Sequence, residues 1–414
     1  MGRYVPFRAR QAFFWDVQSN WWSGIFAGLY QPFVPIIARD PRLLHGSAFD
    51  VGLLLTLPFV GMFLTAPAAE LGMGRRPVPI VVWVNVLARL LVVPAALVGS
   101  PTLFVTIIGV HYTIGALTLP AYASIVQQVY PAGQRAKLVA MTRAVALAGV
   151  VVGSLAGGFL IELVGFRWVF AGSVLIGLWA MVLFSRIRVR VPEPSATPVR
   201  RGLGYREMLN ILRADAVFRT FSIAFLVFGF CNIASEPLKP LFQVDILHIT
   251  PVWVGILAAA SNGVCGLAYY AWGRYIDFRG PYRSCVISFI LMAGSALVYS
   301  GTTRVELLLL SGLLWGLSIP AIELGWISAA ADRGGAEGMA RYTAVHFTLV
   351  GVRGLTANFA GVALYDAGMG FGLGADVSLR ILFAVLAVGC LIGTGVMAAA
   401  AKRRDWQHET PPDE

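Results

Sequence analysis

Apolar runs long enough to cross a bilayer recur along nearly the whole chain. Crossing about 30 Å of hydrocarbon takes roughly 20 apolar residues in a helix, and we count about twelve such runs. Only 13% of the 414 residues are charged, whereas roughly a quarter are charged in a soluble domain. The sequence therefore predicts an all-α membrane protein with about twelve transmembrane helices.

The basic residues fall mainly in alternate short loops. This distribution follows the positive-inside rule, by which Lys and Arg mark the cytoplasmic loops. It accounts for the net charge of +11 and argues against nucleic acid as a partner. We expect a multi-pass protein of the cell (inner or plasma) membrane with both termini cytoplasmic and the lipid bilayer around it.

The second half of the sequence repeats the first at a separation of roughly 205 positions, as in transporters built from parallel repeats. An Arg- and Pro-rich stretch between the halves indicates a linker. We predict two six-helix halves related by a pseudo-two-fold repeat. The repeated pairs include Pro32 and Pro237, Pro35 and Pro240, and Asp40 and Asp245. The predicted boundaries are 1–190 for the first half, 191–216 for the cytoplasmic linker, 217–404 for the second half and 405–414 for a cytoplasmic tail.

Four glycines lie within one apolar run, at Gly149, Gly153, Gly157 and Gly158. Each glycine destabilises a helix interior by about 1 kcal/mol relative to alanine. Four of them in one helix are therefore expected only where contacts outside the helix require small residues. The spacing of four places three of them on one face, where small residues let another helix backbone approach closely. The run predicts a helix-packing seam, whether passive or part of a moving element.

Several ionisable side chains lie inside the apolar runs, where each charge costs about 2.5 to 3.5 kcal/mol on insertion scales and therefore needs a partner or a water-filled cavity. Asp16 and Asn20 share a polar face of the first span. Glu236 and Lys239 are three residues apart and could instead neutralise each other. Most Trp and Tyr residues lie near span ends, as interfacial belts do. The predicted substrate and proton pathway comprises Asp16, Asn20, His111, Arg143, Glu236, Lys239, Glu323, His346 and Arg353, with Asp16 and Glu323 as the carboxylates that change protonation.

The loop after the eighth predicted span contains Gly273, Asp277, Arg279, Gly280 and Arg283. Their spacing resembles the Gly-x-x-x-Asp-x-Arg-Gly-x-x-Arg loop of the major facilitator superfamily of secondary transporters. The resemblance implies the fold of that family and a loop whose acid and arginines latch the cytoplasmic gate. The first-half copy of this loop keeps Gly74, Arg75 and Arg76.

Two further motifs resemble the same family. The glycine run from Gly149 to Gly158 is similar to the family's antiporter motif, which is associated with efflux. In the fourth span, His111 to Gly115 is similar to an Arg-x-x-Gln-Gly motif linked to proton coupling, with histidine in the arginine position. A histidine could titrate near neutral pH, or it could be a hydrogen-bonded packing residue.

These observations predict a secondary transporter that works by alternating access, with its substrate site between the halves. Proton-coupled efflux of a lipophilic or cationic compound is the first hypothesis. Uptake or facilitated diffusion of a small polar or anionic solute is the second, and a transport-inactive scaffold or assembly factor is the third. Because no nucleotide-binding loop, zinc-hydrolase motif or Cys/His cluster of metal spacing is present, we expect no ATP-driven pump, enzyme, metal or cofactor. We expect a monomer that binds a small-molecule substrate and protons.

Overall fold

The computed structural model describes residues 7–72, 74–131, 133–189 and 205–409, which are helical almost throughout. Eleven of the described helical segments are long and apolar enough to cross a membrane, and no strand occurs in these ranges. The prediction of an all-α membrane protein is therefore confirmed. The elements of the first half are α1 (Phe7–Tyr30), η1 (Gln31–Phe33), α2 (Val34–Arg39), α3 (Ala48–Gly72), α4 (Pro77–Leu90), α5 (Val92–Leu97), α6 (Pro101–Ala116), α7 (Leu119–Val129), α8 (Arg135–Val164) and α9 (Phe166–Phe184). The elements of the second half are α10 (Tyr205–Ala214), α11 (Ala216–Ser235), α12 (Leu238–Leu241), η2 (Phe242–Ile246), α13 (Pro251–Arg279), α14 (Pro281–Gly301), η3 (Val305–Leu307), α15 (Leu308–Gly370) and α16 (Ala375–Glu409).

The first predicted span corresponds to α1, η1 and α2, which follow one another without a loop. This stretch is absent from the eleven apolar segments, because its charged and polar side chains lower its hydropathy. The 24 residues of α1 nevertheless correspond to about 36 Å of helix, enough to cross the hydrocarbon core. We infer that α1 is the twelfth spanning helix and that neighbouring helices cover its polar face.

Prolines break the predicted third and fourth spans. A proline lacks the N–H that would bond to the carbonyl four residues earlier. Accordingly α4 ends at Leu90, four residues before Pro94, and α6 ends at Ala116, four residues before Pro120. The segments that follow, α5 and α7, are therefore separate helices within the same predicted spans.

Helix α15 holds the predicted tenth and eleventh spans. The two are separated at Gly335, whose φ of 57° lies outside the helical range. A glycine adopts this left-handed conformation without a steric penalty from a Cβ atom. Trp326 before the turn and His346 after it stack on each other, with ring centroids 5.0 Å apart, so the two arms lie side by side.

The chain divides into two compact units. The first comprises Met1–Pro198 with His248–Gly263, and the second comprises Val199–Leu247 with Val264–Glu414. Residues 190–204, which include the first part of the predicted linker, lie outside the described residues, while the later part of the linker forms α10. The half, linker and tail boundaries drawn from the sequence stay predictions.

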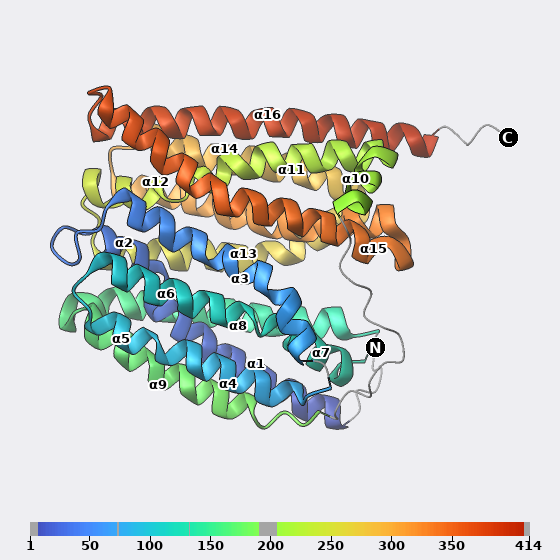
Figure 1. Cartoon of the computed structure of the whole chain (residues 1–414), viewed down its shortest axis with the longest axis horizontal. Helices are drawn as coiled ribbons and strands as arrows, with labels where there is room; N and C mark the ends of the chain where they lie inside the picture. Colours follow the sequence, from blue (N-terminus) through green and yellow to red (C-terminus); the bar gives the residue numbers. More distant parts are fainter. Residues whose placement is uncertain (1–6, 73, 132, 190–204, 410–414) are drawn as a thin grey trace. The chain divides into compact units, whose positions relative to one another are not determined.

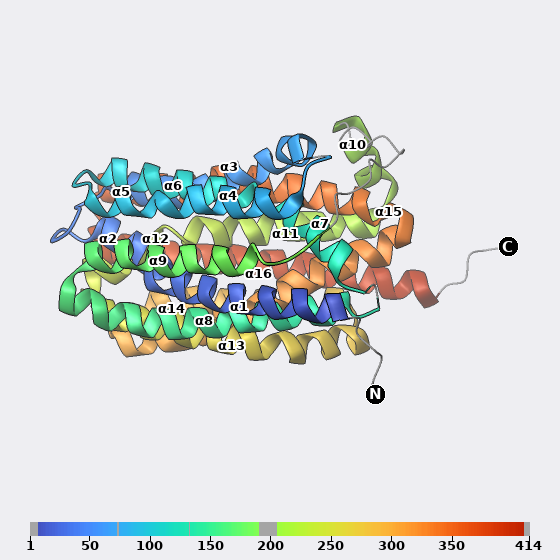
Figure 2. The same cartoon turned by 90° about the horizontal axis from the view of Figure 1, so that it is seen from below.

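In the first unit α1 packs along α8 and α9, and α3 packs against α6 (Figure 1). Figure 2 shows α1 and α8 running together in a second view. In the second unit α14 packs against α15 and α16, and α11 also packs along α16. The core of the second unit is rich in buried phenylalanines, among them Phe218, Phe221, Phe225 and Phe289. Helix α10 lays Met208, Ile211 and Leu212 against that core.

Candidate functional site

A buried carboxylate lies in the first unit, at Asp16 on α1. The side chain is 3% exposed. It accepts hydrogen bonds from the hydroxyl groups of Tyr130 at 2.5 Å and Tyr122 at 3.2 Å, and from the Asn20 amide at 2.9 Å. All three donors are neutral, and no ion pair to Asp16 occurs among the described residues. Asp16 and Asn20 thus lie together, as their spacing of four predicts.

The two tyrosines come from the segment that follows the break before Pro120. Tyr122 lies in α7 and Tyr130 directly follows it. The sequence interpretation missed them as partners, because a tyrosine near the end of a span is also typical of an interfacial belt. The sequence signal that could have indicated them was Asp16 itself. It has no charged partner on its own helix, so further hydrogen-bond donors were to be expected on another one.

A second polar network in the first unit joins α1, α4, α6 and α9. His111 is 7% exposed; its Nε2 lies 2.6 Å from the Tyr30 hydroxyl and its Nδ1 lies 2.7 Å from the Ala88 carbonyl oxygen. The neighbouring Arg89 donates to the Gly177 carbonyl and, at 2.9 Å, to the Ser23 hydroxyl. Both ring nitrogens of His111 are therefore occupied by protein groups. This geometry fits the packing alternative for His111, and its coupling role stays a prediction.

The second unit contains a buried arginine at Arg353, on the second arm of α15. It is 9% exposed and donates from Nη1 to the backbone carbonyl of Phe225 on α11. Its guanidinium carbon lies 5.9 Å from the centre of the Phe225 ring. The Nε nitrogen is buried without a hydrogen-bond partner. No carboxylate pairs with Arg353 in the part of the chain that the structure describes.

His346 lies two turns before Arg353 on the same arm. The side chain is 5% exposed. Its ring stacks on Trp326 and meets the Phe225 ring edge-on, with centroids 5.0 Å apart in both cases. His346 makes no hydrogen bond within the described ranges, in contrast to His111. The structure therefore brings His346 and Arg353 together around Phe225.

Glu323, Glu236 and Lys239 all have protein partners in the second unit. Glu323 accepts a hydrogen bond from the Tyr269 hydroxyl on α13. The Lys239 ammonium lies 2.6 Å from a Glu236 carboxylate oxygen, which is the mutual neutralisation weighed from the sequence. Arg143, on α8 in the first unit, is exposed.

The glycines of α8 lie against neighbouring helix backbones in the first unit. A Cβ atom at Gly149 would approach the Trp21 carbonyl oxygen to 2.5 Å, and one at Gly157 would lie 3.2 Å from the Leu29 Cα. Gly153 likewise contacts the backbone of α1 at Ile25. Gly158 faces the start of α13 instead, where a Cβ atom would lie 2.8 Å from the Pro251 carbonyl oxygen. The stretch thus contacts α1 on one side and α13 on the other.

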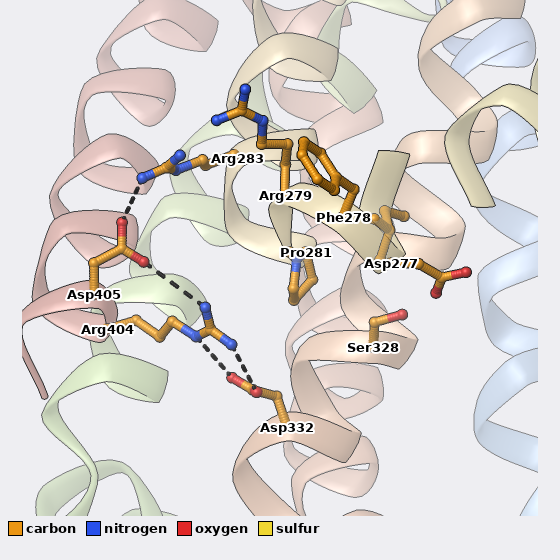
Figure 3. A pocket seen from close by; sticks show the side chains of 11 residues that line it. Asp277, Phe278, Arg279, Pro281, Arg283, Ser328, Asp332, Arg404 and Asp405 are labelled. Atoms are coloured by element: carbon orange, nitrogen blue, oxygen red, sulfur yellow. Dashed lines mark hydrogen bonds and ion pairs between the residues drawn. The ribbon is translucent and has the colours of Figure 1, made fainter. Parts of the chain in front are cut away.

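The loop motif between α13 and α14 lines a pocket of about 560 Å³ in the second unit, shown in Figure 3. Arg283 from the motif binds Asp405 at 2.8 Å, and Arg404 binds Asp332 at 3.2 Å. Arg404 also lies 3.7 Å from the neighbouring Asp405, so the charges form a chain from α14 through α16 to α15 (Figure 3). The acidic partners Asp332 and Asp405 were missed from the sequence, because they lie on helices distant from the motif.

The other motif positions surround this charge chain. Asp277 lines the pocket, and the Arg279 guanidinium lies 5.0 Å from the Phe278 ring centre. Gly280 has a φ of 81°, which a glycine adopts readily as the chain reverses between two helices. A Cβ at Gly273 would meet nothing within 4 Å. In the first-half copy, Gly74 has a positive φ of 71°, and Arg75 and Arg76 are exposed.

An ion pair at the start of α11 joins it to both arms of α15. One oxygen of Asp215 caps α11 by accepting from the Phe218 N–H at 2.9 Å. The other accepts from Arg333 at 2.8 Å and from the Tyr342 hydroxyl at 3.0 Å. Burial alone would raise the pKa of Asp215, but the hydrogen bonds from these three donors and the charge of Arg333 lower it below its ordinary value. Arg341, which precedes Tyr342 in the second arm of α15, binds Glu207 of α10 at 2.5 Å.

The family is decided by comparison with known proteins. A family model described as Major Facilitator Superfamily matches residues 19–357. The chain belongs to the Major Facilitator Superfamily. This major facilitator protein is therefore a secondary transporter and not an enzyme. No curated protein is significantly similar to it in sequence.

Solved structures agree with this assignment at the level of fold. A bacterial homologue of the human lysosomal transporter Spinster, in an inward-facing and unoccupied conformation, superposes with a TM-score of 0.67 at 16% sequence identity. The match covers 97% of this chain and 98% of the homologue. The nucleoside transporter NupG superposes with a TM-score of 0.65 at 11% identity, covering 95% of this chain and 99% of NupG. At such identities the likeness extends to the fold alone.

Among the described residues no group of three or more His, Cys, Asp and Glu side chains could hold a metal ion. The ionisable groups of this transporter instead form the separate clusters described above, each within one unit. Their roles in binding and coupling stay predictions.

Proposed function

We propose that this major facilitator protein couples the movement of a small organic molecule to protons, with Asp16 as the group that carries the proton. The observation that supports the proposal is the set of partners around Asp16, which are two tyrosine hydroxyls and one amide. Because none of them carries a charge, protonation of Asp16 takes its cluster from a single negative charge to neutral. A carboxylate paired with an arginine would leave a buried cation behind when protonated.

This change in charge provides a means of coupling. A ligand shifts a conformational equilibrium only if it binds one state more tightly than the other. A proton is such a ligand if Tyr122 and Tyr130 contact the Asp16 carboxylate in one conformational state of the transporter but not in the other. In the state without these contacts the proton binds more tightly, because a carboxylate without hydrogen-bond donors in an apolar setting favours the protonated form. We propose alternating access between the two predicted halves as the motion, with Glu323 as the second proton-carrying group.

The charge chain of Figure 3 supports a latch in the second unit. It joins the α13–α14 loop to α16 and α15 through Arg283, Asp405, Arg404 and Asp332. Opening it requires two ion pairs to separate. The positive-inside rule supports a cytoplasmic location for this end of the unit, together with cytoplasmic termini in a cell membrane.

Two classes of substrate follow from the sequence, a lipophilic or cationic compound and a polar or anionic solute. Arg353 favours the anion, because it is a buried cation with no carboxylate partner among the described residues. The contact of the α8 glycines with α1 and α13 supports the resemblance to the antiporter motif. We therefore retain efflux as the direction. We also propose a monomer as the transporting form.

Transport by purified protein in liposomes tests this proposal. Ethidium serves as a lipophilic cation, and benzenesulfonate as an anion that does not cross bilayers in a neutral form. With an imposed pH gradient, the wild type should accumulate one of these probes and Asp16→Asn should lose the gradient dependence. Asp50→Asn is the matched control, because Asp50 is also buried, at 5% exposure, but lies in the first turn of α3 and binds Ser47 and Thr102.

The outcomes separate the hypotheses. Gradient dependence that survives Asp16→Asn contradicts the assignment of the proton to Asp16. Gradient dependence lost equally in Asp50→Asn means that the effect is structural. A folded wild-type protein that moves neither probe favours the scaffold hypothesis.

A further inference from the structure

One edge of the Arg353 guanidinium is left without a partner. Nη1 donates to the Phe225 carbonyl, Nε is buried and unpaired, and Nη2 makes no hydrogen bond to any described residue. The side chain is more than nine-tenths buried, at 9% exposure. The N–H groups of Nε and Nη2 point in parallel from the same edge of a guanidinium, and this fork matches the two oxygens of a carboxylate.

The rest of the guanidinium is held in place by α11. A Cβ atom at Gly229 would lie 2.7 Å from Nε and closer still to Cζ and Nη1, so only a glycine leaves room for the group. The carbonyl and the ring of Phe225 contact it one turn earlier on the same helix. The free edge therefore has a defined position, which reduces the entropy lost when a ligand binds.

Arg89 shows how a buried arginine is arranged when the protein itself satisfies it. It is 6% exposed, and its two terminal nitrogens donate to the Gly177 carbonyl and the Ser23 hydroxyl. Arg353 uses only one of its nitrogens. The two acids at the ends of α11 are engaged elsewhere, since Glu236 binds Lys239 and Asp215 binds Arg333.

His346 supplies a second point of contact. It lies seven residues before Arg353, two turns along the same helix face, which corresponds to about 10 Å. It is 5% exposed and makes no hydrogen bond within the described residues. The Phe225 ring contacts both side chains, and Trp326 stacks on His346. The Phe225 ring of α11 thus lies between the guanidinium of Arg353 and the imidazole of His346 on α15.

From these contacts we infer that the Nε and Nη2 edge of Arg353 binds the carboxylate of an organic anion whose apolar body lies along Phe225 towards His346 and Trp326. The inference rests on the proposed function, because it names the class of substrate that the transporter carries. The inferred ligand is a carboxylate on an apolar body. Equal binding of an inorganic anion or of a neutral aromatic compound would contradict the inference.

Benzoate is the probe, titrated into the purified full-length protein in detergent by isothermal calorimetry. Benzamide has the same shape without the charge, and inorganic sulfate has charge without an apolar body. We expect saturable binding of benzoate by the wild type and no binding of benzamide or sulfate in the same range. Arg353→Lys keeps the charge but lacks the fork, and should weaken benzoate binding by about tenfold to a hundredfold. Arg89→Lys, the matched control, should bind as the wild type does.

The inference is overturned if the wild type fails to bind benzoate, if benzamide or sulfate binds equally well, or if Arg353→Lys retains wild-type affinity. Should Arg353→Lys not fold, His346→Phe is the second variant, and wild-type affinity in that variant refutes the contact with His346. Asp16→Asn separates the two proposals. Benzoate binding that survives this change supports the carboxylate site whether or not proton coupling through Asp16 holds.

Discussion

Replacing Gly149 by alanine should destabilise the first unit, although alanine is the better helix former. The new Cβ atom would lie 2.5 Å from the Trp21 carbonyl oxygen, about 0.9 Å short of the 3.4 Å at which ordinary contact begins. It would also lie 3.1 Å from the Cα of Gly24. Both neighbours are backbone atoms of α1, so no side chain can rotate away and the helices themselves have to separate.

The magnitude follows from two opposing terms. Overpacking of this kind costs about 1–3 kcal/mol, and the change from glycine to alanine in a helix returns up to about 1 kcal/mol. Gly172 in α9 provides the control, because a Cβ there meets nothing within 4 Å. Gly149→Ala should therefore be less stable than Gly172→Ala by about 1–3 kcal/mol.

The assay is thermal unfolding of the purified variants in one detergent, followed by tryptophan fluorescence. At roughly 2–4 °C per kcal/mol for a unit of this size, the two melting temperatures should differ by about 2–12 °C. A Gly149→Ala protein that melts at or above the temperature of Gly172→Ala would refute the reasoning. It would mean that α1 and α8 are not in close contact in the bilayer protein.

Three further predictions concern the second unit. Because its hydrogen bonds and the charge of Arg333 lower the pKa of Asp215 below the ordinary 3.8, its carboxylate stabilises the fold above that pH, and this contribution is lost as the pH falls through the lower folded value. The difference in melting temperature between the wild type and Asp215→Asn should therefore be full at about pH 6 and should shrink as the pH is lowered below 3.8. Arg404→Gln should cost only about 0–1 kcal/mol, since its pair with Asp332 is partly exposed. It should nevertheless speed hydrogen exchange around Asp332, at the end of the first arm of α15 before Gly335, and unchanged exchange there would contradict the latch. Lys239→Met alone should lower the melting temperature more than the double change of Lys239→Met with Glu236→Gln, because the single change leaves an unpaired carboxylate. A lower melting temperature for the double variant would show that the two residues do not act as an ion pair.

The charge pattern along one helix could be read from the sequence, because helical spacing fixes which residues share a face. Asp16 and Asn20 are four apart and hydrogen-bond each other, and Glu236 and Lys239 are three apart and form an ion pair. The close contact of the α8 glycines with another backbone follows from their spacing of four in the same way. The loop motif of Gly273 to Arg283 indicated the family, which the family comparison confirms.

Partners on other helices could not be read in this way. Periodicity says which face a side chain occupies, but it carries no information on which helix lies opposite. Tyr130 therefore came to light as a donor to Asp16, and Asp405 as the partner of Arg283, only in the structure. The breaks before Pro94 and Pro120 add to this difficulty, because each divides a predicted span into two helices.

The sequence by itself determined that this chain is a helical membrane transporter, because hydrophobic length, charge placement and repeated motifs are local properties of the chain. The tertiary structure alone decided which buried charges are satisfied. Arg89 and Arg353 look alike in the sequence, each a single arginine inside an apolar run. The positions of the Gly177 carbonyl and the Ser23 hydroxyl satisfy the first, while the packing of α11 against α15 leaves the second with two free donors.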